Sequence, residues 1–326
     1  MKFGPVQTGD ALGAVLAHSV PLGKGRLRKG HVLAAQDIAA LQAAGYARIT
    51  VARYDAGDLN EDDAAAELAA ALAGAGVRLS QAATGRVNIF ATGPGVASID
   101  VAAINACNSV NPMITVATVP PMQRVGPDVM IATIKIISYA VPKEDVARAC
   151  AAAQSALRVL PPRFKTASLI ETRIETQGTD KGRRALAGRL DRLGVSLTPP
   201  VIVPHAQDPL AAALQEAAGD VIFIQTASAT SDSFDVGPAA LRQAGGVVTQ
   251  FGMPVDPGNL LFLGQLDQKP VIGLPGCARS PALNGADWVL ERVICGIDLT
   301  PADFALMGVG GLLKEIPTRP KPRADI

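Results

Sequence analysis

Hydrophobic and polar positions follow two different patterns along this chain, and the change falls near residue 160. Before it, short β-rich runs separated by Gly and Pro predict strands, for example over 86–91. Segments 61–73 and 143–157 have helical spacing instead, and Asn60 is placed to cap the first of them. The first half is therefore expected to be a mixed α+β region.

Beyond residue 160, apolar runs typical of buried parallel strands alternate with helical patterns. The expected strands cover 166–171, 200–203, 220–226, 260–266 and 270–274, and the expected helices cover 181–193, 209–218, 236–244 and 280–294. Such alternation predicts a parallel sheet with helices on both faces. The expected fold class is α/β, a three-layer domain with a mainly parallel sheet, preceded by the smaller mixed region.

The expected domain boundary is the pair Pro161-Pro162. Residues 1–160 form the mixed region, with length enough for two small lobes, and residues 161–316 form the α/β domain. Residues 317–326 are proline-rich and charged, which is typical of an extended tail or linker.

Composition excludes several partners. The 326 residues include 30 basic and 29 acidic side chains, so no global field attracts nucleic acid or an acidic membrane. The longest apolar run, 129–137, is interrupted by Lys135 and is too short to span a bilayer. The four cysteines lack metal-ligand spacing, and the N-terminus does not have a secretory pattern. We expect a soluble cytoplasmic protein with free thiols.

The first candidate ligand segment follows the apolar strand 220–226. In ten residues it carries five hydroxyls and two carboxylates, and its candidate binding residues are Thr226, Ser228, Thr230, Ser231, Asp232 and Asp235. Hydroxyls and backbone N–H groups bind phosphate, while a carboxylate binds Mg²⁺ or a pterin N–H edge. Equally, Ser233 or Asp235 could be a helix cap within an ordinary polar loop. The residues alone leave both interpretations open.

Two further candidate segments lie near expected strand ends. The first is a turn with candidate residues Pro257, Gly258 and Asn259, which is also typical of a purely structural type II turn. The second precedes the last expected helix, with candidate residues Gly273, Pro275, Gly276, Cys277, Arg279 and Ser280. There Gly276 permits close backbone approach, Arg279 offers a fork for phosphate, and Ser280 is expected at the helix start.

These segments together resemble a known family. In order and spacing, Asp220–Asp235, Asp256–Leu266 and Pro270–Ser280 resemble the molybdopterin-binding domain of molybdenum-cofactor biosynthesis proteins, which include molybdopterin adenylyltransferases, molybdotransferases and gephyrin. The matching residues are Asp235 in the first segment, Pro257-Gly258 in the second, and Gly273-Leu-Pro-Gly276 with Ser280 in the third.

Two other stretches extend the resemblance. The pattern from Gly13 to Gly45 is similar to the segment that precedes this domain in molybdotransferases. Phe251–Asn259 and Gly276–Pro281 resemble a bacterial branch in which the domain is often fused to a nucleotidyltransferase of the molybdopterin-cytidylyltransferase type. The proline-rich tail stands where such a fused partner would begin.

The resemblance implies a cytoplasmic protein that binds molybdopterin or a nucleotide form of it, assisting nucleotidyl transfer or metal insertion. It implies Asp235 as the catalytic carboxylate and Mg²⁺ ligand. Cys277-Ala278 replace the Asn-Pro of the family motif, and the phosphate clamp expected from the residues themselves is Arg279. Implied partners are a small-molecule pterin, a nucleotidyltransferase or molybdoenzyme maturation protein, and further copies of the chain in a homo-oligomer.

Departures from the family pattern keep other functions open. The loop glycines of the family are replaced by Ala227, Ser228 and Asp232, and the lysine of its Pro-Gly-Lys-Pro turn is Asn259. Its Thr-Gly-Asp-Glu after the first strand is absent, and the polar candidates there are Glu175, Thr179 and Asp180. The alternatives are a non-catalytic carrier or sensor module and a generic nucleotide or phosphate binder on the same scaffold.

Overall fold

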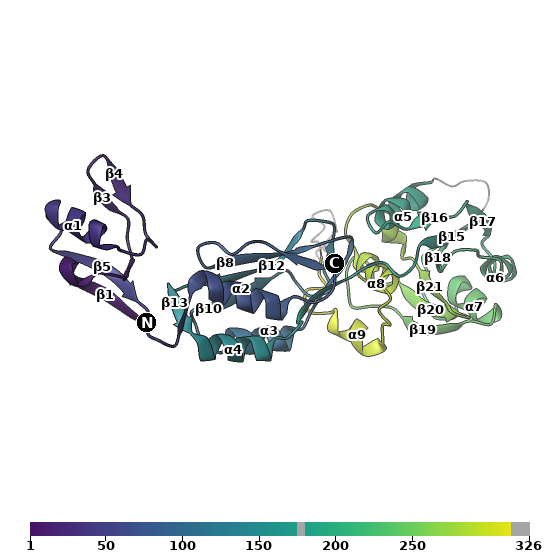
Figure 1. The fold of residues 1–326 in the computed structure, drawn as a ribbon. Helices are drawn as coiled ribbons and strands as arrows, with labels where there is room; N and C mark the ends of the chain where they lie inside the picture. Colours follow the sequence, from purple (N-terminus) through teal and green to yellow (C-terminus); the bar gives the residue numbers. More distant parts are fainter. Residues whose placement is uncertain (175–179, 314–326) are drawn as a thin grey trace, which may run out of the picture. The chain divides into compact units, whose positions relative to one another are not determined.

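The computed structural model describes residues 1–174 and 180–313 (Figure 1). Its chain divides into two compact units, one of residues 1–93 and 97–159 and the other of residues 94–96 and 160–326. The main division between units thus falls between Val159 and Leu160, next to the Pro161-Pro162 pair. The tail expected over 317–326 and the candidates Glu175 and Thr179 lie outside the described residues.

The first unit begins with a small antiparallel sheet. Its strand order is β1 (Lys2–Gln7), β5 (Arg48–Arg53), β2 (Val15–Leu16), and α1 (Ala35–Ala43) accompanies it. Strands β3 (Val20–Leu22) and β4 (Gly25–Leu27) form a separate hairpin. Leu16, Leu33 and Leu41 are almost completely buried and, with Ile49 and Val51, make the core of this region.

The rest of the first unit has its own larger core. The strands are β6 (Asp58–Asn60), β7 (Val77–Leu79), β8 (Arg86–Ala91), β9 (Gly95–Ile99), β10 (Ile114–Thr118), β11 (Arg124–Val125), β12 (Met130–Ile136), β13 (Ala140–Pro142) and β14 (Leu157–Leu160). The helices are α2 (Glu61–Leu72), α3 (Val101–Asn108) and α4 (Lys143–Ala152). Leu68 and Leu72 of α2 pack in one core with Ile89 and Ile134 of the sheet β10-β12-β8-β7.

One predicted helix and its cap are confirmed here, and another helix is corrected. The side chain of Asn60 accepts hydrogen bonds from the backbone N–H groups of Asp62 and Asp63, which caps α2 as expected. The helix expected over 143–157 ends at Ala152, however, and Leu157 begins strand β14. A chain reversal separates them, with Ser155 at a positive φ of 54°.

The second unit contains one large mixed sheet. Its order is β16 (Ser196–Leu197), β15 (Thr166–Arg173), β18 (Val221–Gln225), β21 (Lys269–Gly273), β20 (Phe262–Leu266) and β19 (Val247–Phe251), with β17 (Val201–Pro204) also paired to β15. The pairings of β15 with β16, β17 and β18, and of β18 with β21, are parallel. Those of β20 with β19 and β21 are antiparallel. The expected α/β class is confirmed at this level.

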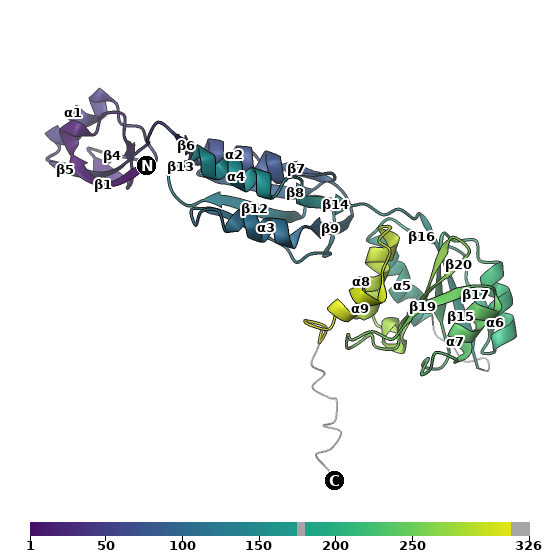
Figure 2. The ribbon, with the colours of Figure 1, turned by 90° about the horizontal axis from the view of Figure 1, so that it is seen from below.

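Helices lie on both sides of this sheet. Figure 2 shows α5 (Lys181–Asp191) and α8 (Gly285–Ile294) on one side and α6 (Gln207–Gln215) and α7 (Val236–Gln243) on the other. On the second side, Leu210 and Leu214 of α6 and Leu241 of α7 pack against apolar residues of the sheet. Burial of such side chains contributes roughly 1.5–3 kcal/mol each, which fixes both helices on the strands.

The last long helix begins later than the sequence suggested. Residues Gly276–Arg279 form the short 3₁₀ helix η2, and α8 begins only at Gly285. The reason is a capping box: the Asn284 side chain accepts from the N–H of Ala286, and Asp287 Oδ2 accepts from the N–H of Asn284. Ser280 therefore does not begin the helix, and the helix start expected there is wrong. A short helix α9 (Pro301–Leu306) follows.

Candidate functional site

Strand register brings the candidate segments to one edge of the sheet. Glu171 of β15 pairs with Gln225 of β18, and Ile224 of β18 pairs with Gly273 of β21. These three parallel strands therefore end almost level, and the chain leaves each of them at the same edge. Because β20 runs the opposite way, the turn around Pro257 enters the sheet from that edge too. Ligands of open α/β sheets bind at this edge.

A hydrogen bond joins the first and third candidate segments. The Arg279 guanidinium donates through Nη2 to the backbone carbonyl of Thr226, at 2.6 Å. The N–H of Leu274 also donates to the carbonyl of Ile224, at 2.8 Å. Arg279 is exposed, so the side chain expected to hold a phosphate also ties down the start of the first loop.

The first loop is held from within and from the neighbouring strand. Thr226 Oγ1 donates to the Ser228 carbonyl at 2.6 Å and lies 3.2 Å from Thr230 Oγ1. Thr172, at the end of β15, accepts from the Ala227 N–H at 2.8 Å, and its hydroxyl lies 2.8 Å from His205 Nδ1. Thr172 was not foreseen from the sequence. Its only signal there was its place near the end of the first strand of the unit.

The carboxylate of Asp235 caps a helix. Its Oδ1 accepts from the Val236 N–H at 2.7 Å and its Oδ2 from the Ser231 N–H at 3.0 Å, at the N-terminus of α7. Of the two roles considered for Asp235, the capping role is the one its contacts display. The Asp232 carboxylate accepts from the N–H of Phe234 at 2.8 Å, and this residue, like Ser228 and Ser231, is exposed. These three side chains remain available to a ligand on this loop.

The turn at Pro257 is tied to the start of α8. The Pro257 carbonyl accepts from the Gly285 N–H at 2.8 Å. Gly258 has a φ of 141°, and a Cβ there would lie 2.7 Å from the Gly285 nitrogen, so only glycine fits. The Asn259 carbonyl accepts from the Met253 N–H at 3.0 Å. These contacts give the turn a structural role, which is one of the two roles considered for it.

A pocket of about 590 Å³ opens beside the third segment. It is lined by Lys181, Arg184 and Ala185 of α5 together with Gly276, Cys277, Arg279, Ser280 and Pro281. Four of the predicted site residues are thus brought together, whereas those of the first loop and of the Pro257 turn are not among its lining residues. Gly273 and Pro275 are buried and are not among the lining residues.

Two basic residues of this pocket, Lys181 and Arg184, were missed from the sequence. They belong to the run Lys181-Gly-Arg-Arg184, which opens the helix after β15. The signal was available, because three cations in the first turn of a helix oppose the helix dipole and are therefore unusual. Arg184 also pairs with Asp180, with 3.1 Å between Nη1 and Oδ1, and both side chains are exposed.

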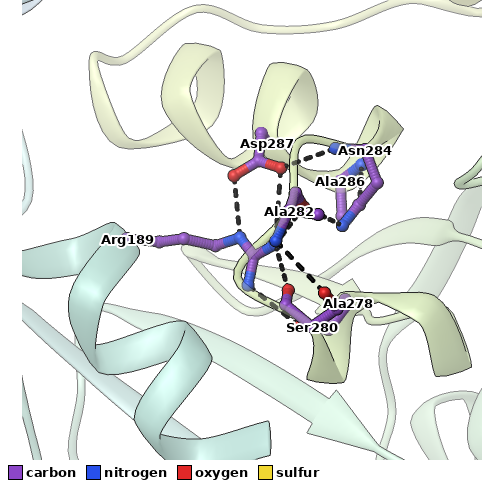
Figure 3. A network of polar contacts seen from close by, with 7 residues as sticks. All are labelled: Arg189, Ala278, Ser280, Ala282, Asn284, Ala286 and Asp287. Atoms are coloured by element: carbon purple, nitrogen blue, oxygen red, sulfur yellow. Dashed lines mark hydrogen bonds and ion pairs between the residues drawn. The ribbon is translucent and has the colours of Figure 1, made fainter. Parts of the chain in front are cut away.

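A buried arginine shapes the wall of the pocket (Figure 3). Arg189 of α5 donates to the backbone carbonyls of Ala278, Ser280 and Ala282, at 2.9, 2.8 and 3.1 Å. Its Nε also donates to Oδ1 of Asp287 at 2.7 Å, and both side chains are at least 96% buried. One guanidinium therefore fixes the loop between η2 and α8 in place. This loop supplies Ser280 and Pro281 to the pocket.

The chemistry of the pocket is cationic and does not include a reactive thiolate. Loss of solvation raises the pKa of the Cys277 thiol, and the neighbouring Asp256 carboxylate adds to the increase. The thiol is therefore protonated near neutral pH. Within residues 1–174 and 180–313, no three His, Cys, Asp or Glu side chains group as metal ligands would. No helix of that part of the chain is long and apolar enough to cross a membrane.

Comparisons with known proteins give the following matches. Residues 5–53 match a family model described as a domain of unknown function (DUF8806). No curated protein matches the chain.

Solved structures give two similar chains. One is the molybdopterin biosynthesis moea protein from Pyrococcus horikosii, at 13% identity and a TM-score of 0.31, over 90% of this chain and 75% of that one. The other is molybdenum cofactor biosynthesis protein B, at 16% identity and a TM-score of 0.31, over 41% of this chain and 95% of that one. Both structures are of molybdenum-cofactor biosynthesis proteins, and likenesses this low do not assign any residue.

Proposed function

We propose that this chain binds a phosphorylated pterin of the molybdopterin type, or its nucleotide form, as part of molybdenum-cofactor metabolism. The observation that carries the proposal is the pocket between α5 and η2, where Lys181, Arg184 and Arg279 surround a glycine-containing loop. Motif residues that resemble the molybdopterin-binding family form one wall of that pocket. Fixed cations and accessible backbone N–H groups are what a phosphate monoester requires.

Each part of the site has a separate role in this proposal. Arg279 and Lys181 bind the phosphate, and the backbone of Gly276 approaches it closely because nothing lies within 4 Å of the position of a Cβ. The exposed Ser228, Ser231 and Asp232 on the first loop offer donors and acceptors to the polar edge of a pterin ring. The hydrogen bond from Arg279 to the Thr226 carbonyl keeps the two parts in register.

A carrier or sensor module is the second candidate function. The observation that favours it concerns Asp235: both of its carboxylate oxygens accept hydrogen bonds from backbone N–H groups. This side chain therefore has a structural role rather than a free carboxylate for catalysis. On this candidate, the chain presents the pterin to a separate nucleotidyltransferase or maturation partner. The Mg²⁺ site and the homo-oligomer implied by the family resemblance remain predictions.

Anaerobic titration of the purified protein with molybdopterin, followed by calorimetry, tests the proposal. Arg279→Ala should weaken binding by about 1.5–3 kcal/mol, the value of a hydrogen bond to a charged group, which is roughly 10- to 150-fold in Kd. Arg242→Ala is the matched control, because Arg242 is also exposed and donates to a carbonyl of the same loop, that of Ser233, but does not line the pocket. Equal losses in the two variants, or no binding by the wild type, would overturn the proposal.

Turnover separates the two candidate functions. Release of pyrophosphate from MgATP or MgCTP in the presence of molybdopterin would make the chain a nucleotidyltransferase. Tight binding without turnover, under conditions where a known transferase is active, would identify it as a carrier.

A further inference from the structure

The N-terminus of α5 has no side-chain cap and carries three basic residues in its first turn. Asp180 precedes the helix, but its side chain makes no capping hydrogen bond, and the first turn carries no acidic residue. Helix α6 also lacks a side-chain cap but carries Asp208 in its first turn, whereas α7 and α8 are capped by Asp235 and Asn284. The first N–H groups of a helix have no partners within the helix and carry partial positive charge. The Asp180 side chain thus leaves the first N–H groups of α5 uncapped.

A buried amide lies directly against this first turn. Gln225, at the end of β18, is only 2% exposed, and neither its Oε1 nor its Nε2 has a hydrogen-bond partner within residues 1–174 and 180–313. A Cβ on Gly182 would lie 1.7 Å from that Oε1, so the amide fills the space left by the missing side chain. Buried polar groups are normally satisfied, and an orphan calls for an explanation.

Arg183, the residue after Gly182, also has a buried polar atom without a partner among the described residues. Arg183 donates through Nη2 to the Thr198 carbonyl, but its buried Nη1 also lacks a partner among the described residues. Lys181 and Arg184 of the same turn line the pocket together with Arg279, and within residues 1–174 and 180–313 none of its lining residues is acidic. Uncapped N–H groups, an unpartnered amide and several cations therefore surround one turn. All of these features favour an anion, and the one carboxylate paired with this turn among the described ion pairs, Asp180, lies outside the pocket lining.

We propose that the first turn of α5 is a metal-independent subsite for a phosphate or diphosphate group. The backbone N–H groups of residues 181–183 donate to its oxygens, Lys181 and Arg184 neutralise its charge, and Gln225 contributes a donor through Nε2. The identity of the whole ligand rests on the proposed function, whereas the anion chemistry does not. Under this inference Lys181 and Arg184 replace the Mg²⁺ that usually accompanies a bound diphosphate.

Calorimetric titration with inorganic phosphate and with pyrophosphate, each in EDTA and in Mg²⁺, tests the subsite. We expect binding in EDTA that the double variant Lys181→Met/Arg184→Met weakens by at least about 10-fold, since two charged hydrogen-bonding groups are lost. Arg192→Met, an exposed substitution at the other end of α5, is the matched control and should leave affinity unchanged. Binding that requires Mg²⁺, or equal affinity in the double variant and the wild type, would overturn the inference.

Gln225→Met gives a second and independent measurement. Methionine keeps the volume but removes the unpartnered amide, so the melting temperature of the free protein should rise while the Kd for pyrophosphate increases by on the order of 10-fold. A purely structural glutamine would give the opposite result, a lower melting temperature with unchanged affinity.

The two proposals fail separately. Pyrophosphate binding that depends on Lys181 and Arg184, without any molybdopterin binding, would refute the proposed function and leave the subsite standing. Molybdopterin binding that depends on Arg279 but not on Lys181 or Arg184 would refute the subsite. The proposed function would then stand without the role given to Lys181.

Discussion

Arg189 and Asp287 form a buried ion pair that joins α5 to α8, with 2.7 Å between Nε and Oδ1 and with 3% and 4% of the two side chains exposed. Asp287 is held in turn by the N–H of Asn284, and Arg189 by the carbonyls of the loop between η2 and α8. The pair is thus fully hydrogen-bonded, which is the condition under which a buried ion pair is tolerated.

Removal of one partner should be costly. Arg189→Met leaves the Asp287 carboxylate buried without its cation, and we expect a loss of about 3–5 kcal/mol in the free energy of unfolding. Urea denaturation measures it, with the exposed Arg192→Met as the control on the same helix. The double variant Arg189→Met/Asp287→Leu should recover part of the loss, since no isolated charge remains. A single variant as stable as the wild type would contradict the role given to this pair.

Two glycines of the third candidate segment should respond differently to alanine. A Cβ on Gly273 would lie 1.9 Å from the buried Phe262 ring, so Gly273→Ala should cost about 1–3 kcal/mol of stability through overpacking. A Cβ on Gly276 would meet open space, so Gly276→Ala should change stability by less than about 0.5 kcal/mol.

Ligand binding gives the second half of this comparison. If Gly276 is present because a ligand approaches its backbone, Gly276→Ala should weaken molybdopterin binding while thermal unfolding stays the same. Unchanged affinity in this variant would show that the glycine does not serve the ligand.

The capping role of Asp235 predicts how two substitutions will differ. Asp235→Ala should lower stability by about 1 kcal/mol, the usual cost of a lost N-cap, whereas Asp235→Asn should be nearly neutral because asparagine caps equally well. Chemical denaturation of both variants measures this. Titration with molybdopterin, with and without Mg²⁺, then tests the expected metal role. If Asp235 is a ligand of Mg²⁺, molybdopterin binding by the Asp235→Asn variant should no longer depend on Mg²⁺.

Asp220 should contribute to stability in a pH-dependent way. Hydrogen bonds from the N–H groups of Lys165 and Thr166 and from the Thr166 hydroxyl hold the pKa of its carboxyl below the ordinary value of 3.8. Because the unfolded chain binds the proton more readily, this contribution is complete above about pH 4 and is lost as the pH falls through the lower, folded-state pKa.

The check is denaturation at pH 7 and at pH 3. Asp220→Asn should be less stable than the wild type at pH 7, and the difference should shrink at pH 3. Asp191→Asn, an exposed substitution at the end of α5, is the control. A difference that does not change with pH would mean that the carboxylate charge is not what stabilises the start of β15 and β18.

Local sequence signals predicted much of the second unit. The apolar run that became β18 and the cap at Asp235 were visible because strand hydrophobicity and N-cap chemistry act over a few residues. The start of α8 was misplaced because Ser280 and Asn284 are both acceptable caps, and the choice depends on Asp287 and on the distant Arg189. Strand β19 was missed because its residues, exposed or half-buried, lack a continuous apolar run.

The pocket was only half predicted, for a related reason. Gly276 and Arg279 belong to a motif that can be read along the chain, whereas Lys181 and Arg184 meet them only after α5 has packed beside η2. Gln225 looked like the last residue of an ordinary strand, and its orphaned amide appears only when its neighbours in space are known. Contacts between segments distant in sequence are what local patterns cannot contain.

The double task of Arg279 has a thermodynamic consequence. The same guanidinium lines the pocket and holds the Thr226 carbonyl at the start of the first loop. A ligand that moves this guanidinium breaks its hydrogen bond to the loop. A molecule that binds the loop and favours one position of the guanidinium then changes the affinity of the pocket by the same free energy, because such couplings are reciprocal. Phe234 on that loop is 80% exposed, so a contact made there is one of those coupled to the pocket. Ligand binding in the pocket and contacts made on this loop are therefore thermodynamically coupled.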